Sequence, residues 1–195
     1  MLIIGSRQQF IADHSSTNYL FFAAKPLSKE SRAVVSKLSS HVDVGSRTAE
    51  ITYNYEFSDL EDDRRKKFLQ HFDVEVRESY DWWTLSVILE SEKLPAEIKL
   101  KDYEVEEEAS LTFEKQGKRV RLCFDGWHQD YDASYGEFGE DTMEELAEMG
   151  LKLREEIYAG KTDALKVMQR YCAEGEIKGG KSAVSKKLAA ILEVV

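Results

Sequence analysis

The fold class follows from one stretch of the chain, Ala109-Ser-Leu-Thr-Phe-Glu-Lys-Gln-Gly-Lys-Arg-Val-Arg-Leu-Cys-Phe124. Its first half alternates apolar and polar residues, which is the period of a strand with one buried face. Gln116-Gly117 then turns the chain, and the alternation resumes as far as Phe124. The pattern predicts a β-hairpin. Because one face is apolar and the other polar, it also indicates an antiparallel sheet.

The same alternation recurs outward from this hairpin. It is clearest after Gly45, where Ala49, Ile51, Tyr53 and two further aromatic residues alternate with polar ones. Further strands are expected at 1–4, 19–24, 74–76 and 83–89, the last after a turn at 79–81. The pattern leaves open whether Trp82 and Trp83 belong to the core or to the surface.

Helical periodicity marks two segments among the strands and dominates the end of the chain. A helix over 27–40 is expected to begin at the cap Ser28, and one over 59–71 at a capping box, Ser58–Glu61. Apolar stripes then predict three helices, the first capped at Asp141 or Thr142. We therefore predict a single α+β domain over 1–195, an antiparallel sheet packed with helices. It would have a strand-rich part (1–124), an acidic aromatic loop (125–140) and a helical C-terminal third (141–195).

Composition restricts the class of partner and the compartment. The chain has 195 residues, 42% of them hydrophobic, and a net charge of −10. This charge disfavours nucleic acid and membrane surfaces and favours a cationic partner. Its two cysteines form neither a disulfide framework nor a CxxC pair, and we expect two buried free thiols. With no signal peptide and no membrane-length apolar run, we expect a cytoplasmic protein.

A nucleotide-binding motif appears near the C-terminus. Gly175-Glu-Ile-Lys-Gly-Gly-Lys-Ser182 fits the pattern G-x-x-x-x-G-K-S, in which backbone amides wrap phosphates. That mechanism requires a strand before the loop, whereas 165–172 has the periodicity of a helix. We therefore interpret this stretch as a connection between two helices.

The sequence holds partial matches to metal-binding and catalytic patterns. The segment 130–141 resembles a calcium loop, but Tyr135 replaces the glycine needed at its sixth position. Of the four histidines, only His128 lies in a carboxylate-rich setting, followed by Asp130 and Asp132, and it could serve as a general base or a metal ligand. No positioned nucleophile–base pair is evident. We therefore expect a protein that is not an enzyme and holds no metal or cofactor.

The charge distribution points to one candidate binding surface. No Lys or Arg occurs between Arg121 and Lys152, and the acids of this stretch are interleaved with aromatic residues. Aromatic side chains supply contact area, and carboxylates steer a basic partner. Alternatively, the aromatic rings fold back onto the sheet and the acids only keep the loop hydrated. The candidate partner-binding residues are Trp127, His128, Asp130, Tyr131, Asp132, Tyr135 and Glu137.

The stretch Phe124-Asp-Gly-Trp-His-Gln-Asp-Tyr-Asp132 resembles bacterial immunity proteins of polymorphic toxin systems, on the strength of its Gly126-Trp127-His128 step. Many of these families have a second histidine where this chain has Asp130. The resemblance implies a small, acidic, cytosolic protein that occludes a toxin domain. We therefore expect a binding protein that neutralises a cationic protein such as a secreted toxin. The alternatives are a metal-dependent hydrolase or other enzyme that uses His128 with Asp130 and Asp132, and a structural or adaptor subunit.

Overall fold

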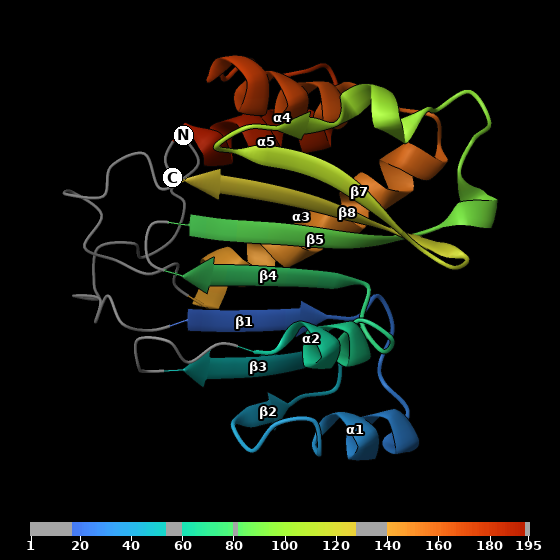
Figure 1. Ribbon diagram of the computed structural model, residues 1–195, viewed down its shortest axis with the longest axis vertical. Helices are drawn as coiled ribbons and strands as arrows, with labels where there is room; N and C mark the ends of the chain where they lie inside the picture. Colours follow the sequence, from blue (N-terminus) through green and yellow to red (C-terminus); the bar gives the residue numbers. More distant parts are fainter. Residues whose placement is uncertain (1–16, 54–59, 80–81, 128–139, 194–195) are drawn as a thin grey trace.

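The computed structural model describes residues 17–53, 60–79, 82–127 and 140–193 (Figure 1). Within these ranges one antiparallel sheet of eight strands has the order β2-β3-β1-β4-β5-β8-β7-β6. The strands are β1 Thr17–Phe22, β2 Val42–Val44, β3 Thr48–Tyr53, β4 Val74–Ser79, β5 Trp82–Glu90, β6 Val105–Glu106, β7 Ser110–Gln116 and β8 Arg119–Trp127. The helices are α1 Lys29–Val35, α2 Asp62–Phe68, α3 Glu140–Tyr158, α4 Asp163–Glu174 and α5 Ala183–Leu192, with short 3-10 turns at Ser91–Lys93 and Leu100–Tyr103. This confirms the α+β class and the helical C-terminal third.

The hairpin predicted from 109–124 is formed by β7 and β8. Their register places Gln116 opposite Arg119, and Gly117 turns the chain with φ 64°. This left-handed conformation is open to glycine and strained for most other residues. On its other edge, β8 pairs with β5 along nine residue positions, from Trp82–Trp127 to Glu90–Arg119. The hairpin therefore joins the centre of the sheet to the edge formed by β6.

Alternation along the strands gives the sheet two apolar layers. α3, α4 and α5 lie on one face, which we call the α3 face, and α1 and α2 lie on the other, the α2 face (Figure 1). β1 serves both layers, since Leu20 and Phe22 belong to the first and Tyr19 and Phe21 to the second. On β5, Trp83 is fully buried on the α3 face and Trp82 is half-buried. The sequence had left the positions of these two tryptophans open.

α3 crosses the sheet closely because of one glycine. It contacts β1, β4 and β5, whereas α4 lies against β6 and β7. A Cβ atom at Gly150 would lie 3.0 Å from Cγ1 of Val74 and 3.3 Å from Cδ1 of Leu85. A larger residue would therefore crowd the buried side chains of Val74 and Leu85 at the centre of the sheet.

Several helix boundaries differ from those predicted. α1 begins after the expected cap, since Ser28 Oγ accepts a hydrogen bond from the Ser31 amide, but it ends at Val35. There Ser39 Oγ accepts from the His41 amide, so a local turn replaces the last helical residues. The capping box is wrong in its position: α2 begins at Asp62 with Glu61 itself as N-cap, and Ser58 lies outside the described residues. α3 begins at Glu140, before either of the caps expected for it.

Candidate functional site

The candidate partner-binding residues follow β8. Trp127 is the last residue of this strand, and its backbone pairs with that of Trp82 on β5. His128, Asp130, Tyr131, Asp132, Tyr135 and Glu137 lie outside the described residues. The described chain ends here with β8 at Trp127 and is described again from α3, which begins at Glu140.

The segment begins later than predicted, because Asp125, Gly126 and Trp127 belong to β8 rather than to a loop. Asp125 stays in the sheet because its carboxylate accepts hydrogen bonds from Thr84 Oγ1 at 2.6 Å and from Ser110 Oγ at 2.8 Å. These donors come from the two neighbouring strands. The carboxylate therefore links β5, β8 and β7 across the α2 face.

Gly126 has a packing role. A Cβ atom at this position would lie 2.7 Å from two atoms of the Trp83 indole, which is closer than side-chain atoms approach one another. Trp83 also packs edge-on against Phe124, with ring centroids 5.4 Å apart, and Phe124 packs against Tyr171 of α4. The glycine of the Gly-Trp-His step therefore lets the buried Trp83 indole approach the backbone of β8 closely.

A second polar group on the α2 face was not predicted. Glu75 of β4 is fully buried, and its carboxylate accepts hydrogen bonds from Arg65 Nε at 2.8 Å and from Arg121 at 3.2 Å. A second nitrogen of Arg65 completes a two-point contact at 3.2 Å. Arg121 also donates to Ser86 Oγ at 2.8 Å. Arg65 comes from α2, so this cluster fastens the helix to the sheet.

The carboxylate and the two guanidinium groups of the cluster stabilise one another in the charged form. Burial by itself would raise the pKa of Glu75, but the guanidinium of Arg65, with help from Arg121, holds that pKa below its ordinary value. Contact with Glu75 likewise raises the pKa of Arg65 despite its burial. Because both of its oxygens are bound to guanidinium groups, the carboxylate is a structural acceptor and is poorly placed to take a proton from a ligand.

Cys123 lies between this cluster and Asp125. Its Sγ is 3.9 Å from Ser86 Oγ and 4.0 Å from a carboxylate oxygen of Asp125. Burial, together with the negative charge of Asp125, raises the pKa of this thiol to about 11. The thiol therefore stays protonated at neutral pH and is a poor nucleophile. Both cysteines are free, with Cys172 buried as expected and Cys123 only half-buried.

The glycine-rich stretch 175–182 joins α4 to α5, which confirms the predicted connection between two helices. Gly175 ends α4 in the left-handed conformation, with φ 65°. Ser182 is the N-cap of α5, because its Oγ accepts from the Ser185 amide at 3.0 Å. The same hydroxyl donates to Glu156 of α3 at 2.7 Å. The two ends of the stretch therefore set helix boundaries: Gly175 ends α4 and Ser182 begins α5.

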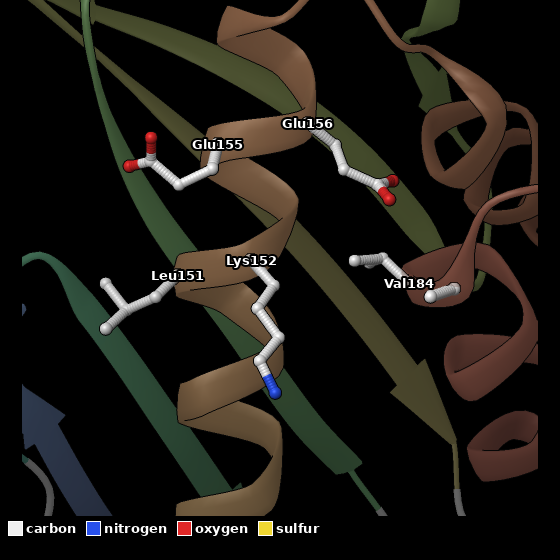
Figure 2. Close-up of a pocket in the computed structure, with 6 residues that line it drawn as sticks. Leu151, Lys152, Glu155, Glu156 and Val184 are labelled. Atoms are coloured by element: carbon white, nitrogen blue, oxygen red, sulfur yellow. The ribbon is translucent and has the colours of Figure 1, made fainter.

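Open hollows occur among the described residues. One, of about 330 Å³, lies between α3 and the start of α5, and Figure 2 shows Lys152 and Glu156 on the side of α3 nearer Val184. Another, of about 370 Å³, lies between α1 and Val44 of β2.

In the described ranges, no three His, Cys, Asp or Glu side chains gather as a metal site would require. No helix there is both long and apolar enough to cross a membrane.

Sequence reasoning missed the Glu75 cluster. Val74-Glu-Val76 reads as an ordinary alternation with a solvated glutamate, and the burial of Glu75 follows only from the tertiary arrangement, which brings Arg65 of α2 and Arg121 of β8 to its carboxylate. Comparison of the chain with models of known protein families and with curated protein sequences finds no match.

Proposed function

We propose that the protein binds a cationic protein through the acidic, aromatic segment between β8 and α3 and neutralises it by occlusion. A secreted bacterial toxin is the partner we favour. The observation that carries the proposal is the distribution of charge: the chain from 122 to 151 has no Lys or Arg, while its acids are interleaved with aromatic residues such as Trp127, Tyr131 and Tyr135. Such a surface offers both contact area and attraction for a basic partner.

The elements on either side support this proposal. β8 is paired on both edges, with β5 and β7, so it is a rigid base for a binding segment. On the other side, Glu144 and Glu148 in the first turns of α3 are exposed and extend the negative charge into the helix. The resemblance of 124–132 to bacterial immunity proteins agrees with this role.

A direct test uses the product of the neighbouring reading frame as the partner. Asp130→Lys combined with Asp132→Lys should weaken its binding by about a hundredfold, because attraction is replaced by repulsion at the contact. Glu107→Lys combined with Glu108→Lys is the matched control, since both residues are exposed and the change in net charge is the same.

Biolayer interferometry at low and high salt would measure both variants, and growth on co-expression of the neighbouring product would report neutralisation. The proposal expects a large loss in the first variant alone, mainly in the association rate at low salt. Equal losses in the two variants would mean that only net charge matters. A neighbouring product that the unmodified protein does not bind would contradict the proposal.

A further inference from the structure

β2 has an open edge. Among the described residues it pairs only with β3, and the amide of Gly45 donates to the carbonyl of Thr48 at 3.0 Å. In an antiparallel ladder, the backbone N–H and C=O groups of successive residues point alternately toward the partner strand and away from it. Because the amide of Gly45 bonds to the strand partner, the backbone groups of Asp43, two residues earlier, also point toward β3. The N–H and C=O groups of Val42 and Val44 therefore point outward, and no backbone bond between described residues uses them.

A cationic hollow lies beside this edge. It is lined by Lys29, Arg32, Ala33 and Ser36, which form one stripe along α1, and by Val44. Its lining includes no acidic residue. α1 and β2 lie together at one end of the sheet (Figure 1). A strand added at this edge would thus pass close to two cations.

The two sides of the edge differ in charge. Val42 and Val44 lie opposite Ile51 and Ala49, which belong to the apolar layer of the α2 face, where Val35 of α1 also packs. Asp43 alternates with them and so lies on the other face of the sheet, opposite Glu50. The positive charge of α1 therefore meets only the side chains of an added strand that point to the α2 face.

We propose that this edge binds an extended acidic peptide of another protein as an additional strand. Its main chain pairs with Val42 and Val44, and carboxylates at every second position meet Lys29 and Arg32. Residues facing Asp43 are neutral or basic. Pairing of two β2 edges about a two-fold axis would instead bring both α1 helices to one face, where their cations repel. The inference is independent of the proposed function, which uses a segment of opposite charge.

The probe is a fluorescein-labelled octapeptide in which Glu alternates with Val or Thr, and the same peptide with Lys in place of Glu is its control. Fluorescence anisotropy should show that the Glu peptide binds and that the Lys peptide does not. Lys29→Glu combined with Arg32→Glu should weaken this binding by about tenfold at low salt. Lys166→Glu combined with Lys186→Glu, at exposed positions of α4 and α5, makes the same change in net charge and should have no effect.

Val44→Pro tests the pairing itself. It removes an outward N–H and no bond to β3, so it should weaken binding of the Glu peptide while the circular dichroism stays unchanged. Amide hydrogen exchange should slow at Val42 and Val44 when the peptide binds. If the proline variant does not fold, amide hydrogen exchange and the variant with Lys29→Glu and Arg32→Glu still test whether the peptide pairs with β2. Equal binding of both peptides, no binding of the Glu peptide, protection elsewhere, or dimerisation without peptide would overturn the proposal.

Discussion

Replacing Glu75 by Gln should destabilise the protein strongly although the two side chains have nearly the same shape. The substitution removes the counter-charge of two guanidinium groups whose side chains are only 13% and 12% exposed, those of Arg65 and Arg121. Gln also turns an amide N–H₂ toward groups that can only donate hydrogen bonds. The variant therefore buries positive charge without compensation.

The magnitude follows from the geometry. At the effective dielectric of protein sites, two opposite charges about 4 Å apart attract by about 4 kcal/mol. Glu75 makes two such pairs, against a cost of several kcal/mol for burying its own charge. Removing one partner from a buried ion pair costs about 3–5 kcal/mol. Since both arginines keep some contact with solvent, we expect a loss of about 3 kcal/mol in the free energy of unfolding at pH 7.

The loss should also depend on pH. Burial raises the pKa of Glu75, but Arg65 and Arg121 outweigh it and hold the pKa below the ordinary value of 4.5. A carboxyl group whose pKa is lowered by folding stabilises the folded state fully above its unfolded pKa. That contribution disappears as the pH falls through the lowered pKa. The difference between the original protein and Glu75→Gln should thus be constant above about pH 5 and shrink in acid.

Urea unfolding followed by tryptophan fluorescence would measure both effects, because Trp83 is fully buried and reports loss of the core. Glu176→Gln is the control, since Glu176 pairs with Lys178 on the surface and its loss should leave the unfolding midpoint unchanged. A loss below about 1 kcal/mol for Glu75→Gln, or a difference that does not shrink in acid, would refute the account of this cluster.

Two further predictions concern the core and the thiols. Gly126→Ala should lower stability by about 1–3 kcal/mol in thermal unfolding, because its Cβ would overlap Trp83. Gly179→Ala, whose new atom would lie 3.7 Å from its nearest neighbour, should be much milder, and equal effects would contradict this packing role. Cys172, which is buried and whose pKa is raised by burial to about 12, should react with Ellman's reagent at pH 8 only after denaturation, and the half-buried Cys123, with its pKa raised to about 11, should react slowly in the native protein. Rapid labelling of the native protein would show that the thiols are not shielded.

Local patterns in the sequence predicted the elements whose causes are local. The turn at Gly117, the cap Ser28 and the connection ending at Ser182 each depend on residues within a few positions, and the structure confirms all three. The start of the acidic segment was misplaced because Asp and Gly are rare in strands. Asp125 and Gly126 remain in β8 because of contacts with Thr84 and Trp83, which lie far away in the sequence.

The Glu75 cluster shows why the rest could not be predicted. Alternation identifies which face of β4 carries Glu75, but the identity of the elements that cover that face depends on how the chain folds back. Here a short helix ten residues earlier brings Arg65, and a strand much later brings Arg121. The candidate partner-binding residues from His128 to Glu137 remain a prediction, since they lie outside the described residues.

The division of the sheet into two apolar layers has a consequence for synthesis of the protein. The eight strands of the described residues precede residue 128, whereas the helices of the α3 face begin only at Glu140. On the ribosome, the layer with Leu85, Val87 and Phe124 must therefore wait for the last third of the chain to emerge. At roughly 5–20 residues per second this wait lasts several seconds. A nascent chain stalled after β8 should accordingly be a preferred client of chaperones that bind exposed hydrophobic surface.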